Sequence, residues 1–418
     1  MSVSELPLDR SVPGIPAERR LADRGAYLDA CATTPPAESV LEAMAEAQRD
    51  AWANPSSLHG HGLAAAESLE RSRLSMAASL GCGPEQVILT SGGTEAIHMA
   101  LHGIAAEEEP ARLLISDVEH PATGAAADQL RRRGWTVMRV PVDHRGLIRL
   151  DALEALLTPP TRLVSLIWGQ SEVGALQDID TIGRLCRGAG ILLHVDAVQV
   201  VGHRPVNLAA LPVDLLSCAS HKLQGPRGIG ALAIRPDLRL TPFIGGGGQE
   251  RGRRGGTESV VLAAGFARAL ELARQRLEHH QGTDPIARDR DRLLERLLAM
   301  EGVRLSGPDP GVQRLPHHIS LLVSTPSGRP LSGRRLVQAM GQQGYAVSSG
   351  SACSSGRGAD PYGLAPSPIL LAMGFGEKEA ATGLRLSLGP WLSAEDLEPI
   401  PAALERARLR LMAGEPVG

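Results

Sequence analysis

Short apolar runs alternate with amphipathic stretches over the first two thirds of the chain. Seven of these runs are rich in Val, Ile and Leu, which is typical of strands buried on both faces. They span residues 87–90, 113–116, 136–140, 163–168, 191–195, 214–219 and 229–234. Patterns of Ala, Leu, Glu and Arg with helical spacing fill most of the intervals between them. Buried strands separated by helices predict an α/β fold whose mainly parallel, seven-stranded sheet is covered on both faces.

The pattern changes near residue 265. A long helical stretch extends to about residue 300, and short strand-like runs and a closing helix follow it. This mixture predicts a smaller α+β unit. We therefore divide the chain into an N-terminal arm (1–25), a large domain (26–264) and a small C-terminal domain (265–418).

Composition and charge narrow the class of protein. Hydrophobic residues make up 43% and charged residues 21% of 418 residues, as in a globular protein with a large core. The net charge of −3 is dispersed, so we expect neither nucleic acid nor a membrane as partner. The arginine runs 131–133 and 251–254 are interpreted as solvated faces or contacts to small anions. The N-terminal segment lacks the apolar core of a secretory signal, and no apolar run is long enough to span a membrane.

The cysteines indicate the redox compartment. There are five, an odd number, and none has the paired spacing of a disulfide framework or a zinc site. We therefore expect no metal and a reducing, cytoplasmic environment.

One lysine stands where covalent chemistry is favoured. Lys222 follows the apolar run 214–219 and precedes a turn rich in Gly and Pro. A lysine at the end of a buried strand is partly desolvated, which makes its amine easier to deprotonate and able to form an imine with an aldehyde. Taken alone, it could also be a surface lysine in a loop.

Two other strand ends carry residues that suit a ligand. After strand 87–90 a Ser-Gly-Gly turn opens a helix near Thr94, where Gly93 and the free N–H groups of the first turn can bind a phosphate. Asp196 follows strand 191–195, at the sheet edge where open α/β sheets bind ligands. If buried it needs a cationic partner, such as a protonated ring nitrogen. Helix capping is the structural alternative for both.

Three residues elsewhere suggest chemistry of their own. His120 follows strand 113–116 and could stack on a planar ring or transfer protons near neutral pH. Cys353 lies in the Ser- and Gly-rich segment SSGSAC, where an accessible thiol is reactive as its thiolate. Arg385 lies in a strand-like run, and its planar guanidinium suits a carboxylate. Each is also compatible with a purely structural role.

Together these stretches resemble the cysteine desulfurases of the class-V aminotransferase family, which are pyridoxal-phosphate enzymes of fold type I. The resemblance covers nearly the whole chain from residue 26. It rests on YLDACATTPP, NPSSLHGHG, TSGGTEA, EH, SEVGALQDI, HVDAVQ, SHKLQGPRGIGAL, GGGQERGRRGGTES, SSGSAC and LRLSLG. It implies a cytoplasmic homodimer that converts L-cysteine to L-alanine. The sulfur would be held as a persulfide on Cys353 and passed to an acceptor protein, as in iron–sulfur cluster assembly.

The resemblance also implies a role for each residue at a matching position. Lys222 would bind the cofactor covalently, Asp196 would pair with its ring nitrogen, and His120 would stack on the ring and assist proton transfer. Gln199 would donate to the phenolic oxygen of the ring. The residues implied to hold the phosphate are Gly93, Thr94, His221 and, from a neighbouring subunit, Thr257. The residues implied to bind substrate are Arg385 and Asn54.

Two positions depart from the family pattern. Ser171 stands where an Asn is usual, and its shorter side chain cannot make the same contact with cofactor or substrate. Ala219 stands where a phosphate-binding Ser is usual, and we expect the neighbouring Ser220 to compensate. A lost donor to phosphate would cost ~1.5–3 kcal/mol. The segment after Cys353 is also longer than in short-loop members.

Two alternatives stay open. One is another class-V enzyme, such as a selenocysteine lyase, although an enzyme without persulfide chemistry has no need of Cys353. The other is a desulfurase-like scaffold or regulator that binds the cofactor weakly, which the two departures favour and the retained Lys222, Asp196 and Arg385 oppose.

Overall fold

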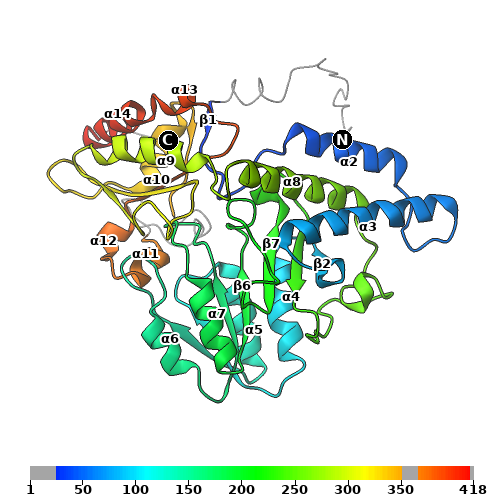
Figure 1. Ribbon diagram of the computed structural model, residues 1–418. Coiled ribbons are helices and arrows are strands. Elements are labelled where there is room, and N and C mark those ends of the chain that lie inside the picture. The colour runs from blue at the N-terminus through cyan, green and yellow to red at the C-terminus, as the bar shows by residue number, and fades with distance from the viewer. Residues whose placement is uncertain (1–24, 351–365, 415–418) are drawn as a thin grey trace, which may run out of the picture.

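The structure is a computed structural model that describes residues 25–350 and 366–414 (Figure 1). A seven-stranded sheet lies at its centre, in the order β2-β8-β7-β6-β5-β3-β4. Its strands are β2 (Val87–Thr90), β3 (Arg112–Ser116), β4 (Thr136–Val140), β5 (Thr161–Ile167), β6 (Leu192–Asp196), β7 (Leu215–Ala219) and β8 (Gly230–Ile234). All seven predicted strands are confirmed, with ends that differ by two residues at most.

Strand direction places the lysine. β3, β4, β5, β6 and β7 run parallel, whereas β8 is antiparallel to both of its neighbours, β7 and β2. Only residues 220–229 join β7 to β8, and they contain a single 3₁₀ turn, η2 (Ser220–Lys222). A connection this short cannot cross over the sheet, so the two strands form a hairpin. Lys222 lies in that hairpin, just beyond the carboxyl end of β7.

Helices cover both faces of the sheet because the buried strand residues alternate between two hydrophobic cores. Leu215 faces one core and Leu216 the other. The first face is covered by α4 (Gly93–Ala105) and α5 (Pro121–Arg132). The second is covered by α2 (Glu38–Asp50), α3 (Gly60–Leu80), α6 (Leu150–Leu156), α7 (Ile179–Gly188) and α8 (Val260–His279).

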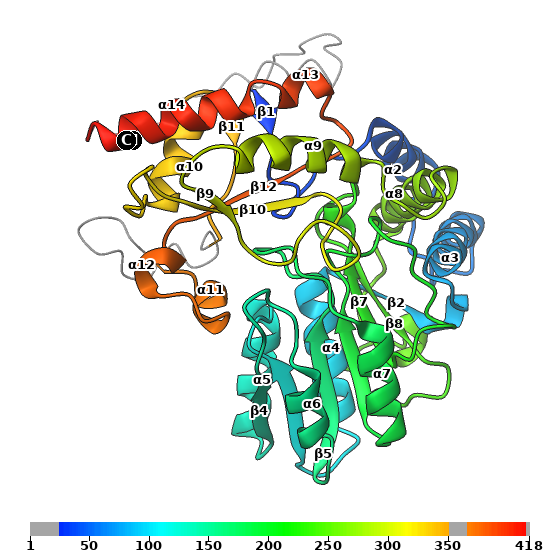
Figure 2. The same ribbon diagram turned by 60° about the vertical axis from the view of Figure 1, so that its left-hand side comes forward.

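A second unit lies above one end of this sheet, as Figure 2 shows. Its antiparallel sheet has the order β12-β10-β9 and packs with several helices around a separate core. Its elements are α9 (Ile286–Leu298), β9 (Val303–Leu305), β10 (His318–Val323), α10 (Gly333–Gly341), β11 (Tyr345–Ala346), α11 (Pro368–Ala372), α12 (Glu377–Ala380), β12 (Gly383–Ser387), α13 (Ala394–Leu397) and α14 (Ile400–Met412).

The two units share chain segments. β1 (Ala26–Tyr27) pairs in parallel with β11, and Leu28 belongs to the core of the second unit. The boundary predicted near residue 265 falls inside α8, which packs on α2 and α3 in the core of the large domain. The core of the second unit begins at Ile286. In the described part of the chain, no helix has the length and apolar character needed to cross a membrane.

Candidate active site

The structure brings His120, Asp196 and Lys222 together, as their positions after β3, β6 and β7 predict. Burial lowers the pKa of His120, while the charge of Asp196 raises it and that of Lys222 lowers it. Burial raises the pKa of Asp196, and the charges of His120 and Lys222 lower it. Because His120 and Asp196 act on each other's titration and Lys222 acts on both, the three groups occupy one site at the carboxyl edge of the sheet. We call these three residues the strand-end cluster.

The buried carboxyl group of Asp196 is placed to pair with a cation. Its side chain is buried, and Oδ1 accepts a hydrogen bond from the Val198 amide (3.0 Å). Burial alone would protonate this carboxyl, so a positive group beside it restores its charge. A protonated ring nitrogen fits this requirement. Beside it, His120 accepts from the Ala122 amide through Nδ1 (3.1 Å), which fixes the orientation of the imidazole.

Lys222 is covered by the chain that follows β1. Its Nζ donates to the carbonyl oxygens of Cys31 (2.5 Å) and Ala32 (2.7 Å). The same segment is fastened to the hairpin by Thr34, whose Oγ1 donates to the carbonyl of His221 (3.0 Å) and accepts from the Gln224 amide (2.7 Å). The N-terminal motif YLDACATTPP therefore forms one wall around the lysine.

A signal in the sequence supports Lys222 independently of the motifs. Lys222 and Lys378 are the only lysines in the chain, although lysines and arginines together number 43. Arginine cannot be deprotonated in proteins and so cannot replace an amine nucleophile. Lys378 is exposed on α12, whereas Lys222 is partly buried beside a carboxylate and a histidine. Of the two lysines, only Lys222 belongs to the strand-end cluster.

The Ser-Gly-Gly turn fits a phosphate. α4 begins at Gly93 with no side-chain cap, which leaves N–H groups of its first turn available to an anion. Gly92 adopts a φ of +151°, which a residue with a side chain rarely adopts. A Cβ built on Gly93 would lie 2.8 Å from Cγ2 of Val198 and 3.7 Å from Cβ of Ala219. The turn thus lies directly beside the segments that carry Asp196 and Lys222.

The expectation that Ser220 compensates for Ala219 is not supported by this geometry. Ala219 faces Gly93, whereas the hydroxyl of Ser220 lies on the side of Gly225, where an added Cβ would be 2.0 Å from Oγ. The Ser220 hydroxyl is buried and makes no hydrogen bond within the described residues. Ala219 is the last residue of β7 and Ser220 begins the 3₁₀ turn η2, so the shift of one residue moves the hydroxyl away from the turn at Gly93.

Other predicted residues are placed around this centre in different ways. Gln199 donates through Nε2 to the carbonyl of Cys31 (2.9 Å), and Nδ1 of His221 contacts Oγ1 of Thr33 (3.1 Å). Burial lowers the pKa of His221 to about 4, so it is neutral at pH 7. Asn54 is exposed, and its Oδ1 accepts from the Ser56 amide (2.9 Å). No contact between Asn54 and Lys222 or Arg385 is present among the described residues.

The glycine-rich loop, residues 245–257, is tied to the large domain by arginines. Both Arg73 and Glu250 are buried and form a two-pronged ion pair (2.7 and 2.8 Å), and Glu250 also accepts from the Leu89 amide (2.8 Å). Arg254 pairs with Glu95 in the first turn of α4 (2.8 and 3.2 Å). The interpretation of residues 251–254 as a solvated face is therefore wrong for Arg254. This loop carries Thr257, which is exposed.

Arg385 lies in β12 and is buried. Its Nη2 pairs with Oδ1 of Asp29 (2.7 Å), and its Nη1 donates to the carbonyl of Ser171 (3.0 Å). Among the described residues its Nε is buried and has no hydrogen-bond partner, which leaves this donor for a ligand. Ser171 thus contributes its backbone to this part of the site. Neither this backbone contact nor the pairing with Asp29 was predicted from the sequence.

Cys353 lies outside the described residues, but both ends of its segment meet one buried carboxyl. The Oγ of Ser367 donates to Oε1 of Glu172, and a Cβ built on Gly350 would lie 2.0 Å from the same oxygen. Burial raises the pKa of Glu172 to about 7. The backbone of Ser348 pairs with that of Arg385 (2.6 and 3.0 Å). Residue 350 is therefore next to Glu172 and two residues from a contact with Arg385.

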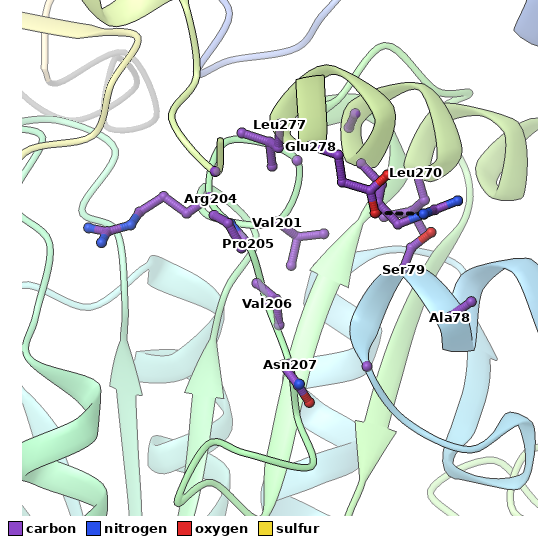
Figure 3. A pocket seen from close by; sticks show the side chains of 15 residues that line it. Ala78, Ser79, Val201, Arg204, Pro205, Val206, Asn207, Leu270, Leu277 and Glu278 are labelled. Atoms are coloured by element: carbon purple, nitrogen blue, oxygen red, sulfur yellow. Dashed lines mark hydrogen bonds and ion pairs between the residues drawn. The ribbon is translucent and has the colours of Figure 1, made fainter. Parts of the chain in front are cut away.

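A separate cleft of about 260 Å³ lies between α3, α8 and the segment after β6 (Figure 3). Val201, Val206 and Leu270 contribute apolar side chains to it, and Arg204 extends away from them. The Arg204 Nη1 donates instead to the carbonyl of Val312 (2.9 Å). None of the predicted site residues lines this cleft, so it does not belong to the strand-end cluster.

Comparison with known proteins places this geometry in a family. The model of the family described as "Aminotransferase class-V" matches residues 26–400. The chain belongs to the class-V aminotransferase family. A cysteine desulfurase of Klebsiella pneumoniae is 37% identical over 392 residues, which cover 93% of this chain and 94% of the relative. The cysteine desulfurase IscS of Methanosarcina thermophila is 34% identical, covering 92% and 93%.

Solved structures of this family have the same fold. A NifS-like protein superposes with a TM-score of 0.82 at 31% identity, covering 93% of this chain and 100% of that protein. A structure described as SspA in complex with cysteine gives a TM-score of 0.74 at 29% identity, covering 88% and 99%. The predicted fold and the resemblance to cysteine desulfurases are confirmed.

Proposed function

We propose that this class-V aminotransferase family member is a pyridoxal-phosphate-dependent cysteine desulfurase that converts L-cysteine to L-alanine. The observation that carries the proposal is the strand-end cluster, in which a lysine, a buried aspartate and a histidine share one site beside an uncapped helix N-terminus. Pyridoxal phosphate, when bound, supplies an aldehyde for an amine and a ring that withdraws electrons from the substrate. Asp196 fits its protonated ring nitrogen, and the first turn of α4 fits its phosphate.

Each residue of the site has a defined task in this proposal. Lys222 provides the amine that holds the cofactor and later moves a proton at its Nζ. Asp196 would keep a cationic ring nitrogen charged, and His120 would stack on the ring. The phosphate is held by the N–H groups at Gly93 and Thr94, by His221 and by Thr257 from a second subunit. Ser220 is not part of this set, because its hydroxyl faces Gly225.

Substrate recognition is assigned to the opposite side of the site. The guanidinium of Arg385 is fixed by Asp29 and by the Ser171 carbonyl, and its Nε is available for a carboxylate. A pre-oriented arginine loses little freedom when it binds a carboxylate, which favours this residue as the clamp. Asn54 belongs to the substrate-binding set if it reaches the site of another subunit, because it is exposed and contacts neither Lys222 nor Arg385 within the described chain.

Cys353 is the proposed sulfur acceptor. Only two residues separate it from Gly350, which lies against Glu172 beside Arg385. The Cys353 thiolate would attack the sulfur of the substrate cysteine, so that the S–S bond of a persulfide forms as the substrate's Cβ–Sγ bond breaks. The electron pair of that bond stays with the carbon, which takes up a proton and becomes the methyl group of alanine, and the persulfide is kept until a sulfur-acceptor protein collects it. We further propose a cytoplasmic homodimer, as the similarity to cysteine desulfurases implies, in which the exposed Thr257 contacts the phosphate held by the second subunit.

The test is the reaction itself. Purified protein should be yellow and should form alanine and sulfide in equal amounts from L-cysteine when a thiol reductant is present. Cys353→Ser should keep the yellow colour and lose sulfide release. A colourless protein that cannot be loaded with pyridoxal phosphate would favour the scaffold alternative instead. Faster turnover of selenocysteine, with Cys353→Ser unimpaired, would favour a selenocysteine lyase.

A further inference from the structure

The amine of Lys222 has a second position that does not involve the cofactor. Its Nζ donates to the carbonyls of Cys31 and Ala32 at 2.5 and 2.7 Å, about 190 residues upstream in the chain. Gln199 donates to the same Cys31 carbonyl (2.9 Å), which fixes its direction. Carbonyl oxygens bind a charged ammonium more strongly than a neutral amine. These two carbonyls therefore suit the lysine when it is protonated and not joined to anything else.

Cys31 is held firmly enough to keep its carbonyl in place. Its side chain is 2% exposed, its N–H donates to Oγ of Ser387 (2.9 Å), and its Sγ lies 3.3 Å from Nε2 of His317. Burial raises the pKa of the Cys31 thiol and lowers that of the His317 imidazole. Both groups are therefore neutral at pH 7, and a hydrogen bond joins the thiol to the imidazole, with its direction set by the tautomer of His317.

His317 is fixed in turn from its other side. Its ring stacks on that of His203, with centroids 3.7 Å apart and planes 20° apart. Nδ1 of His203 contacts Oδ2 of Asp284 (2.9 Å), which is also paired with Arg276 (3.2 Å). His203 follows β6 in the large domain, whereas His317 precedes β10. The imidazole therefore has little freedom to turn away from the thiol.

We propose that Cys31 and His317 are positioning residues for Lys222. Their hydrogen bond holds the carbonyls of Cys31 and Ala32 where they receive the Lys222 amine whenever this amine is not joined to the cofactor. The inference rests on the proposed function in one respect, that Lys222 is the lysine that binds the cofactor. It assigns a role to a cysteine and a histidine that touch neither substrate nor cofactor.

The sequence permits a direct test, because Lys222 and Lys378 are the only lysines. The full-length chain, freed of cofactor, is treated briefly with acetic anhydride at pH 7, and the acetylation of the two lysines is compared by mass spectrometry. The exposed Lys378 is the internal reference. The variants are Cys31→Ala, His317→Ala, the double variant and Cys31→Ser. Cys186→Ala is the matched control, since this thiol is equally buried but lies in α7.

The carbonyls should hold the amine as an ammonium, which does not react with the anhydride. We expect the Lys222-to-Lys378 ratio to be low in the unmodified chain and in Cys186→Ala, and to rise about tenfold in Cys31→Ala and His317→Ala as one hydrogen bond is lost. The double variant should match the single variants, because both remove the same bond. Cys31→Ser should restore the low ratio, since a hydroxyl can also donate to His317.

An unchanged ratio in Cys31→Ala would overturn the proposal, and so would additive effects in the double variant without rescue by Cys31→Ser. Circular dichroism shows whether each variant is folded, and Cys31→Ala alone decides the matter if His317→Ala does not fold. The yellow colour of the loaded, unmodified protein tests the role of Lys222 in cofactor binding separately. Failure of the labelling test with a yellow protein would therefore remove only the positioning role.

Discussion

The strand-end cluster and the glycine-rich loop, which the proposed function assigns to cofactor binding, are held in place by opposite means. His120, Asp196 and Lys222 come from strand ends, where the backbone ladder of the sheet fixes their positions. The loop has no such ladder, and buried or half-buried arginine pairs hold it instead. A ladder distributes its stability over many bonds, whereas the loop depends on a few charged contacts. Loss of one side chain should therefore damage chemistry in the cluster and stability at the loop.

Lys222→Ala should produce the largest effect. The substitution removes the amine but leaves the hairpin of β7 and β8 intact, so the variant should fold normally. We expect complete loss of the yellow colour after dialysis and no sulfide release above background, with an unchanged urea unfolding midpoint. Absorption spectra before and after dialysis provide the measurement. Equal colour in variant and unmodified protein would rule out Lys222 as the lysine that binds the cofactor.

Arg73→Met should act on stability instead. It leaves the Glu250 carboxylate buried without its partner, which costs ~3–5 kcal/mol when a buried ion pair is broken. Glu250 also accepts from the Leu89 amide at the sheet edge, so loss of the pair should loosen the loop that carries Thr257 and weaken cofactor binding. Urea unfolding and cofactor titration measure the two effects.

The control for this experiment lies two residues away on the same helix, on its exposed face. Arg71 pairs with Glu67 on the exposed face of α3 (3.4 Å), and such pairs contribute at most ~1 kcal/mol. Arg71→Met should therefore change the unfolding midpoint little and leave cofactor affinity unaltered. If the two variants lost equal stability, the glycine-rich loop would not depend on its buried pair, and the contrast with the strand-end cluster would disappear.

The same contrast explains which parts of the site can be predicted from the sequence. Strand ends can be recognised because buried strands are continuous apolar runs, and parallel order brings their carboxyl ends to one edge. This is why Asp196, His120 and Lys222 were found. The pair of Arg73 and Glu250 joins residues 177 positions apart, and nothing in either local pattern distinguishes them from surface charges.

Two further expectations meet structural features that the local pattern does not reveal. The Ser220 hydroxyl, which was expected to compensate for Ala219, lies on the side of Gly225 and not of Gly93. The boundary expected near residue 265 lies inside α8, which continues to His279 and packs in the core of the large domain. The scarcity of lysine was visible in the sequence from the start, and it is the best single indication of Lys222.

Glu119→Gln tests a buried carboxyl beside Asp196 of the strand-end cluster. Its Oε1 accepts from the Ile167 amide (3.0 Å) and from Ser116, and burial raises the pKa of this carboxyl to about 8. In the unfolded chain the pKa of a glutamate is about 4.3. The folded state therefore keeps the proton that the unfolded state loses. The bound proton therefore stabilises the folded state fully below about pH 4.3, and this stability is lost as the pH rises toward 8.

Glutamine resembles the protonated acid and does not titrate. Glu119→Gln should therefore have nearly the same free energy of unfolding as the unmodified protein at pH 5. At pH 9 its free energy of unfolding should be higher, by no more than about 4 kcal/mol. Urea midpoints measured across this range provide the profile, and Glu46→Gln on the exposed face of α2 is the control. Parallel profiles for Glu119→Gln and the unmodified protein would mean that Glu119 is already ionised when folded.

Ala219→Ser should have the smallest effect and lies where the two regions meet. Ala219 faces Gly93 at the start of α4, the helix whose Glu95 holds Arg254 of the glycine-rich loop. A hydroxyl on this side of β7 adds one donor toward the proposed phosphate position, and a hydrogen bond to a charged group is worth roughly ~1.5–3 kcal/mol. We therefore expect the dissociation constant of pyridoxal phosphate to fall at least about tenfold, measured by fluorescence titration of cofactor-free protein. Ser220→Ala is the matched control and should leave this constant unchanged, because its hydroxyl faces Gly225. If Ser220→Ala weakened binding and Ala219→Ser did not strengthen it, the phosphate would lie on the other side of the strand, and the strand-end cluster and the glycine-rich loop would not share a ligand.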